Sequence, residues 1–337
     1  MERNTMFKQG LLALVVAGSL SSQAFAETHP TADFKVATKT SEALQQLIPA
    51  QAKLEILESN AKWSEGPLVL KDNSVIWSDI VNNRVLQWSE KEGTTTWLYP
   101  AQFHNGHAMD NKGHILAASH GKRAIERQET DGSWRVLVDL YEDKKLNSPN
   151  DLIVDKEGEI WFTDPTFGIL KKEEGYGGNP VAGGEFSYRY NPETQKIVRL
   201  NTPEVKTPNG IALSPDQKTL YIADSQLGHN PNDNSLRHHL VAYDIDNNKN
   251  LSNGRDLANI TTGVPDGIAV DEKGNIWVTG GEYIHIFAPD GKEIGSIKLP
   301  TTVANIIFNQ LPNGKNVAYI TGSNTLYRLE VAVQGIK

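Results

Sequence analysis

The stretch NDLIVDKEGEIWFTD, residues 150–164, carries the pattern that decides the fold. It opens with an amide and an acid, continues as an apolar strand, turns at Glu157-Gly158 and ends in a second apolar strand with a small polar cluster. Degenerate copies of this phrase recur along the chain, and they begin at Glu65, Asn105, Asn150, Asn209, Asp266 and Asn305. Their starts lie 40, 45, 59, 57 and 39 residues apart, and periods of this length are typical of repeat architectures.

Each copy predicts a β-hairpin, because turn residues separate two runs rich in alternating, aromatic or β-branched residues. A third strand follows in every unit, as at residues 84–88 and 185–190, and a fourth strand follows in most of them. Six units of about four strands predict an all-β protein, a six-bladed β-propeller. The alternative of two β-sandwich domains would need a break in composition, and the sequence shows none.

Two segments before the first copy have their own patterns. Residues 53–59 (KLEILES) alternate apolar with polar residues but have no hairpin partner, so we predict a lone strand that completes the last blade and closes the ring. Thr40–Leu47 favours a short helix capped by Ser41 and packed on the outside of the fold. The alternative for this second segment is a disordered leader.

The first residues resemble a targeting segment rather than part of the fold. Arg3 and Lys8 precede a short apolar run at residues 10–20, and Ala24-Phe25-Ala26 supplies a small-x-small end, as in a secretory signal peptide. A membrane anchor is the alternative, but the apolar run is shorter than the roughly 20 residues of a spanning helix. We therefore expect a signal peptide at 1–26, an N-terminal extension at 27–52 and the propeller at 53–337. The mature protein is expected to be periplasmic or secreted, without membrane contact.

Composition limits the chemistry that the protein can use. The net charge is −8 and no basic tract is present, which argues against nucleic acid as a partner. The chain has no cysteine, so disulfides, thiolate metal sites and a cysteine nucleophile are excluded. It also lacks the Gly-x-Ser-x-Gly elbow of many serine hydrolases.

The residues that open the six phrases share one property, a side-chain oxygen. The innermost strand of each propeller blade lines the central channel, so we expect these residues to meet as a ring at one mouth: Glu65, Asn105, Asn150, Asn209, Asp266 and Asn305. Carboxylate and amide oxygens suit a hard divalent cation such as Ca²⁺. The alternative is that Asn-Gly and Asp-Gly are turn dipeptides chosen for positive φ. His104 and His107 are not expected to form a zinc pair, because their spacing in a strand predicts opposite faces.

Two units are longer than the others. Their insertions, residues 170–184 and 226–238, follow the polar cluster that ends a second strand. Long polar loops in compact folds commonly serve binding. We therefore expect a mobile lid over the mouth, and plain surface decoration is the alternative.

The chain resembles the gluconolactonase / SMP-30 / regucalcin-like family of calcium-dependent six-bladed propellers. The matching text covers roughly residues 63 to 330, and the order of its motifs is more specific than any one of them: Ser64-Glu-Gly-Pro67, Trp77-Ser-Asp-Ile80, His120-Gly-Lys-Arg123, Asn147-Ser-Pro-Asn-Asp151, Trp161-Phe-Thr-Asp-Pro165, Pro208-Asn-Gly210 and Pro265-Asp-Gly267. The Asn105-Gly106 and His120…Arg123 motifs resemble the secreted bacterial gluconolactonase branch.

The resemblance implies particular roles for residues of this chain. Glu65, Asn209 and Asp266 would hold the metal, and Asn150 would lie at the same centre as a ligand or a substrate contact. Substrate-facing roles are implied for these residues: Asn105, Asn150, His120 and Arg123. The cofactor would be one divalent cation, most simply Ca²⁺, with Zn²⁺, Mn²⁺ or Mg²⁺ as alternatives.

These features together indicate a metal-dependent hydrolase that opens a gluconolactone-type sugar lactone to the aldonic acid. The cation would act as a Lewis acid, and Asp266 or Glu65 would take the proton from water; the sequence does not choose between them. One alternative is an aryl-ester or organophosphate hydrolase on the same metal site, because fold does not fix function. The other is a non-catalytic propeller that binds a ligand or a protein.

Overall fold

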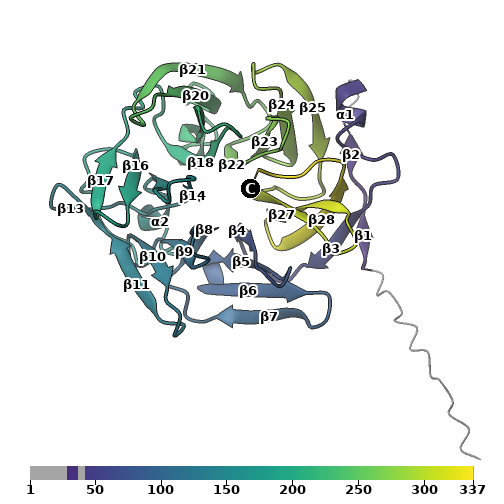
Figure 1. Ribbon diagram of the computed structural model, residues 1–337, viewed down its shortest axis with the longest axis horizontal. Helices are drawn as coiled ribbons and strands as arrows, with labels where there is room; N and C mark the ends of the chain where they lie inside the picture. Colours follow the sequence, from purple (N-terminus) through teal and green to yellow (C-terminus); the bar gives the residue numbers. More distant parts are fainter. Residues whose placement is uncertain (1–28, 37–41, 337) are drawn as a thin grey trace, which may run out of the picture.

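The computed structural model describes residues 29–36 and 42–336. The predicted signal peptide, residues 1–26, lies outside the described residues. The chain forms six sheets of antiparallel strands arranged around a central channel, which confirms the six-bladed β-propeller (Figure 1). Among the helices of the described segments, none has the length and apolar character needed to span a membrane.

The blades follow one another along the chain, each running from the channel outward. The first two contain β4 (Ser64–Val69), β5 (Val75–Asp79), β6 (Arg84–Ser89) and β7 (Gly93–Leu98), then β8 (His104–Met109), β9 (Ile115–Ser119), β10 (Ala124–Gln128) and β11 (Trp134–Val138). The next two contain β14 (Leu152–Val154), β15 (Ile160–Asp164), β16 (Phe186–Asn191) and β17 (Lys196–Arg199), then β18 (Pro208–Leu213), β19 (Thr219–Asp224), β20 (His239–Ile245) and β21 (Leu251–Asn259).

The fifth blade contains β22 (Pro265–Val270), β23 (Ile276–Gly280), β24 (Tyr283–Phe287) and β25 (Glu293–Lys298). The last blade has only three strands from the end of the chain: β26 (Asn305–Gln310), β27 (Asn316–Gly322) and β28 (Thr325–Val331). Its fourth strand is β3 (Leu54–Glu58), which pairs antiparallel with β28. The prediction that a lone early strand closes the ring is therefore confirmed.

The segment before β3 also joins the propeller. Strand β1 (Thr31–Ala32) pairs with β3, and β2 (Lys35–Val36) pairs with β25, so each adds a fifth strand to a blade. Helix α1 (Glu42–Gln45) buries Leu44 against the fifth blade, which confirms a short helix on the outside of the fold. Residues 40 and 41 of the predicted helix lie outside the described residues.

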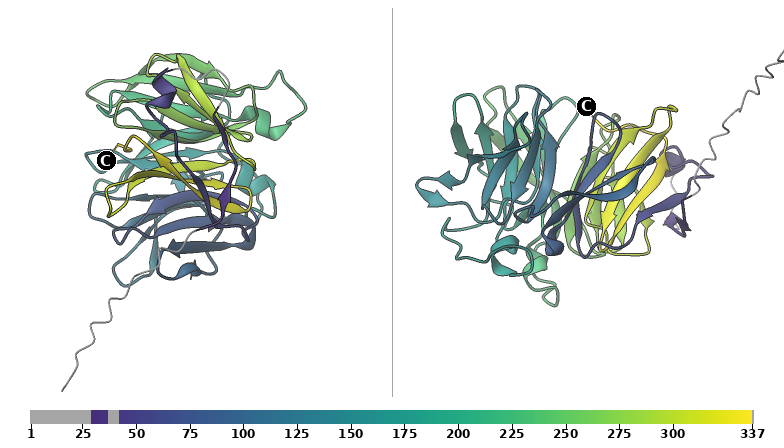
Figure 2. Two further views of the ribbon diagram at one scale, coloured as in Figure 1. Left: turned by 90° about the vertical axis from the view of Figure 1, so that its right-hand side faces the viewer. Right: turned by 90° about the horizontal axis from the view of Figure 1, so that it is seen from below.

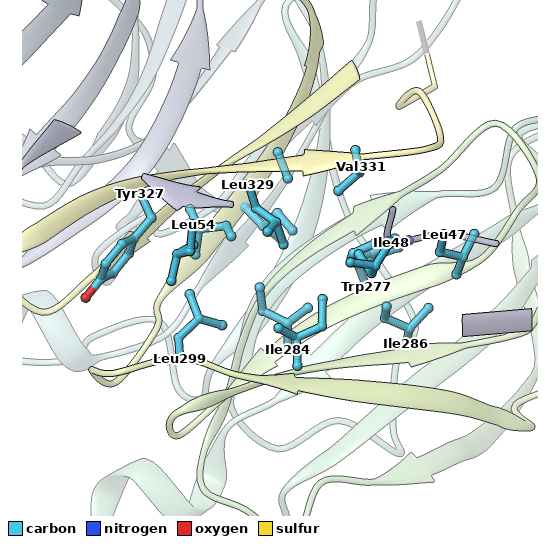
Figure 3. Close-up of a cluster of buried hydrophobic side chains, with 14 of the residues drawn as sticks. Leu47, Ile48, Leu54, Trp277, Ile284, Ile286, Leu299, Tyr327, Leu329 and Val331 are labelled. Atoms are coloured by element: carbon cyan, nitrogen blue, oxygen red, sulfur yellow. The ribbon is translucent and has the colours of Figure 1, made fainter. Parts of the chain in front are cut away.

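The core consists of apolar layers between neighbouring blades. Figure 3 shows the layer between the last two blades, where Leu54 and Leu329 of one blade lie near Ile284 of the other. Strands β5, β15 and β23 are buried along their whole lengths and each contributes a tryptophan: Trp77, Trp161 and Trp277. A strand packed on both faces needs apolar side chains on both, which explains why these segments read as continuous apolar runs rather than as alternating ones.

Aspartates at the hairpin turns link local structure to this core. Asp155 accepts backbone N–H groups of its own turn, and it also accepts the indole N–H of Trp161 at 2.9 Å. Asp271 does the same in the fifth blade, with Trp277 at 3.1 Å. In these two hairpins one carboxylate accepts hydrogen bonds from both the turn backbone and a buried indole N–H. The turn therefore fixes the position of the tryptophan in the strand that follows it.

Three further aspartates end the second strands of their blades and accept backbone N–H groups from the connecting loops: Asp79, Asp164 and Asp224. Asp79 also pairs with Arg84 at 2.8 Å, and Asp224 pairs with Arg237 at 2.7 Å. Among the described residues, no ion pair is formed by Asp164, and burial raises the pKa of its carboxyl to about 8. These three residues therefore cap the loops that lead into their blades.

Both insertions lie on one face of the ring, and the C-terminal residues lie at the opposite face (Figure 2). In the structure the first insertion begins at α2 (Phe167–Leu170), three residues before the bound of 170 expected from the sequence. The second insertion begins with the 3₁₀ helix η2 (Gln226–His229). Glu185 holds them together, because it accepts hydrogen bonds from Thr166 and Thr207 and forms an ion pair with His229. A small hairpin of β12 (Leu140–Tyr141) and β13 (Lys144–Lys145) and the 3₁₀ helix η1 (Ile80–Asn82) complete the structure.

Candidate active site at the channel mouth

Five of the six predicted ring residues line one cavity of about 230 Å³: Glu65, Asn105, Asn150, Asn209 and Asp266. They come from five successive blades, although more than 200 residues separate the first from the last. Four of them lie in the inner strand of their blade, and Asn150 lies two residues before β14. The first insertion adds Phe167, Lys171 and Glu174 to the lining, and the second adds Gly228 and Pro231. The cavity is therefore walled by the channel mouth and covered by both insertions.

β-Bulges aim four of the five ring residues into this cavity. The register with the neighbouring strand shifts directly after Glu65, and shifts of the same kind span Asn105, Asn209 and Asp266. A bulge places two residues opposite one, which turns a side chain away from its normal alternation. It also brings the rings of His104 and His107 to 5.6 Å from each other, so the prediction of opposite faces was wrong.

The sixth member of the predicted ring is a correction. Ala304, not Asn305, occupies the ring position of the last blade, because its backbone N–H bonds to Thr321 as that of Asn150 bonds to Thr163. The inner strand pair of the last blade has no bulge, and it keeps an unbroken register from Asn305 onward. A slip of one residue turns a side chain to the other side of a strand. The six ring positions therefore carry five oxygen-bearing side chains and one methyl group.

Asn305 instead forms a second tier with Asp151. The side chains of these two residues are hydrogen-bonded to each other, and each also accepts the N–H of the next residue in the chain. Glycines of neighbouring blades make room for them: a Cβ on Gly106 would lie 2.9 Å from an Asp151 oxygen, and one on Gly267 would lie 2.4 Å from the Asn305 side chain. Both tier residues also line a separate apolar cavity of about 320 Å³ deeper in the channel.

The electrostatics of the mouth are those of crowded carboxylates. Burial raises the pKa of Glu65 well above its usual range, and the neighbouring charges of Asp266 and Asp151 raise it further. Burial and Asp151 likewise raise the pKa of Asp266, and burial raises that of Asp151 to about 7. Lys171 is the only basic residue among the described residues that line the cavity. A divalent cation would supply the positive charge that these carboxylates lack.

The donor set decides which cation fits. No group of three or more His, Cys, Asp or Glu side chains in the described segments is arranged to hold a metal, so a cation at this mouth needs the amide oxygens as well. Two carboxylates and three amides make an all-oxygen set, which suits Ca²⁺ better than Zn²⁺ or Cu²⁺. The residues present therefore fit a hard divalent ion.

His120 lies behind the ring rather than in the cavity. It is buried, its Nδ1 lies 2.9 Å from the backbone oxygen of Glu174, and its Nε2 lies 3.3 Å from Nδ2 of Asn105. Burial lowers the pKa of His120 to about 4, so the imidazole is neutral at physiological pH. His120 thus connects the first insertion to the ring.

Arg123 holds the same insertion at a second point. Its guanidinium donates to the backbone oxygens of Leu146 and Asn147, at 2.7 and 3.0 Å, and to that of Asn179 at 3.3 Å. These partners are carbonyl groups of two loops, and Arg123 does not line the cavity. In this structure the His120…Arg123 motif therefore bonds to backbone oxygens of the first insertion and of the loop at residues 146–147, whereas the resemblance had implied that both residues face the substrate.

The sequence profile of the SMP-30/gluconolactonase/LRE-like region matches residues 63–324. The chain belongs to this family. A gluconolactonase of Zymomonas mobilis is 32% identical over 283 residues, which are 77% of this chain and 76% of the relative. The solved structure of a gluconolactonase from Xanthomonas campestris is 34% identical, with a TM-score of 0.81, and covers 91% of this chain and 98% of its own. Regucalcin of Xenopus laevis is 27% identical over 236 residues, 68% of this chain and 73% of its own.

Some residues at this family member's mouth were not singled out from the sequence. Lys171 and Glu174 lie in a glycine-rich insertion without periodicity. The sequence therefore indicated them only as part of a segment expected to cover the mouth. Asp151 had a clearer signal. Four phrases have glycine after the ring residue, and Asp151 interrupts that pattern.

Proposed function

We propose that this member of the family opens a neutral sugar lactone to its aldonic acid with the help of one divalent cation in the mouth cavity. The chain is a lactone hydrolase by family, since gluconolactonases are similar to it over most of its length. The observation that carries the metal dependence is the convergence of five oxygen-bearing side chains, two of them carboxylates with raised pKa values, on one cavity.

Four residues would hold the cation: Glu65, Asn150, Asn209 and Asp266. A bound divalent ion would act as a Lewis acid toward the lactone carbonyl. The cavity has room for one sugar ring, and the amide groups that line it can donate hydrogen bonds to the hydroxyl groups of that ring. Closed over the mouth, the two insertions limit the access of bulk water.

Of the two carboxylates, Asp266 is the better acceptor for the proton of the attacking water. It is partly exposed to the cavity, whereas Glu65 is only 4% exposed and accepts the N–H of Gly66 at 3.2 Å. A general base must reach the proton that it removes. We therefore assign proton transfer to Asp266 and a holding role to Glu65.

A stripped-protein assay tests this function. The protein is freed of metal with a chelator, Ca²⁺, Zn²⁺, Mn²⁺ and Mg²⁺ are added in turn, and acid release is followed with a pH indicator on sugar lactones, aryl esters and phosphotriesters. We expect Ca²⁺ to restore the opening of glucono-1,5-lactone, and Asp266→Ala to abolish it. Full activity in excess chelator would reject the cation, and a higher kcat/KM on aryl esters or phosphotriesters would reject the lactone as substrate.

The location of the enzyme is a separate proposal. The basic start, apolar run and small-x-small end of residues 1–26 support export to the periplasm or the medium. Expression of the full chain followed by fractionation and N-terminal sequencing tests this proposal. A cytosolic protein that retains Met1 would reject it.

A further inference from the structure

The orientation of the Asn105 side chain follows from its neighbours. A backbone carbonyl can only accept, so the contact between His120 Nδ1 and the Glu174 oxygen places a proton on Nδ1. A buried neutral imidazole carries only that proton, and its Nε2 must then accept. The Asn105 atom at 3.3 Å from Nε2 is therefore the amide nitrogen, and the amide oxygen is turned away from His120.

The Asn105 Oδ1 atom has lone pairs free to accept at the mouth. Asn105 lines the cavity together with Glu65 and Asp266, and no hydrogen bond to its Oδ1 is formed by the described residues. An acceptor oxygen beside two crowded carboxylates is unfavourable unless a cation faces all three. We propose that His120 is a positioning residue that fixes Asn105 with its oxygen toward the ring centre, and that Asn105 is thereby a further ligand of the divalent cation.

The lid sets the position of His120 in turn. A Cβ on Gly168 would lie 2.3 Å from the imidazole, and a Cβ on Gly175 would lie 2.1 Å from the Gly168 oxygen. The first insertion is therefore pressed against the ring of His120 and bonded to it through Glu174. Cation affinity depends on this insertion, although neither Gly168 nor His120 touches the cation.

The inference rests on the proposed cation site, and its test measures binding rather than activity. Ca²⁺ is titrated calorimetrically into chelator-stripped full-length protein for the wild type, His120→Ala, Asn105→Ala and the double variant. Each single variant is expected to bind Ca²⁺ about 10- to 100-fold more weakly, the usual effect of losing a ligand's support. The double variant is expected to bind no more weakly than Asn105→Ala, because His120 acts only through Asn105.

Two conservative variants sharpen the test. His120→Gln can accept from Asn105 and donate to the Glu174 oxygen, so it is expected to retain the wild-type affinity within a few-fold. Gly168→Ala removes no polar group but displaces the imidazole, and it is expected to weaken Ca²⁺ binding as His120→Ala does. His238→Ala is the matched control, because among the described residues the His238 imidazole bonds only to the backbone oxygen of Leu236, and its ring lies beside that of His239.

The outcomes separate this inference from the proposed function. Wild-type Ca²⁺ affinity in a folded His120→Ala variant would overturn the role of His120. So would a His120→Ala substitution that weakens Ca²⁺ binding equally whether Asn105 is present or replaced by alanine. If His120→Ala does not fold, wild-type affinity in Gly168→Ala or Asn105→Ala overturns the role instead. A wild-type protein that binds no divalent ion would overturn both the inference and the cation, whereas a metal-binding protein without lactonase activity would overturn only the reaction.

Discussion

Replacing Asp266 by asparagine should have two effects of opposite sign. Burial and the charge of Asp266 raise the pKa of Glu65, while burial and the charge of Asp151 raise that of Asp266, which Lys171 lowers only in part. Two carboxylates that share one Ca²⁺ at its usual ligand distance lie within about 5 Å of each other. At an effective dielectric constant of about 20, two unit charges at that distance repel each other by about 3 kcal/mol.

In excess chelator, Asp266→Asn should therefore unfold at a higher denaturant concentration than the wild type. The gain should be largest at alkaline pH, where both carboxylates are ionised, with about 3 kcal/mol as its upper limit, and it should shrink as the pH falls and one of them takes up a proton. The same substitution should weaken Ca²⁺ binding by about 100-fold or more, since about 3 kcal/mol of attraction is lost.

The assay pairs urea unfolding at pH 9 with calcium titration. Asp244→Asn is the matched control, because Asp244 is an exposed carboxylate paired with Arg255 at 2.9 Å, and neither effect is expected there. A variant that is less stable than the wild type in chelator would refute the reasoning. Asp266 would then be a structural acceptor for Asn209 rather than a repelled ligand.

Three other perturbations follow from the fold and the site. Asp164→Asn should flatten the pH dependence of stability, because the Asp164 carboxyl has a pKa of about 8 in the folded protein against an ordinary 3.8. The stabilisation by the protonated carboxyl is complete below about pH 4 and is lost as the pH rises to about 8. The free energy of unfolding should fall by about 1.4 kcal/mol per pH unit in this range. Parallel unfolding curves of variant and wild type from pH 5 to 8 would contradict this. Leu54→Ala, in the strand that closes the ring, should lower the free energy of unfolding by about 2–5 kcal/mol, measured with urea. A loss below about 1 kcal/mol would mean that the packing of this strand does not determine the stability of the ring. Ca²⁺ at about 100 times its dissociation constant should stabilise the wild type by about 2.7 kcal/mol, and an unchanged melting temperature would argue against the site.

The architecture was predictable because its signals are local and repeated. A turn between two runs of β-branched or aromatic residues, as at Glu157-Gly158, predicts each hairpin. Six such units are compatible with few folds other than a propeller. Closure by residues 53–59 was also predictable, since that strand has no partner nearby in sequence and the last unit lacks a fourth strand. Both inferences depend on counting strands, which a sequence permits.

The details of the site depend on register and on loops, and these were less predictable. Asn305 resembles the other ring residues in sequence, but the last blade lacks the bulge that would aim it into the cavity, and Ala304 takes its place. His120 and Arg123 have the chemistry of substrate contacts, yet in this structure they bond to backbone carbonyl groups of neighbouring loops. A sequence does not show which backbone oxygen a side chain will meet across a loop.

The pairing of β3 with β28 has a consequence for how the protein is made. Strand β3 ends at Glu58, but its partner β28 begins only at Thr325, about 270 residues later in synthesis. At ordinary synthesis rates, roughly 15 to 60 s pass between the two, during which β3 presents an unpaired edge to other nascent chains. Translation speed and chaperone supply should therefore affect the yield of this protein more than that of a fold whose neighbouring strands are adjacent in sequence.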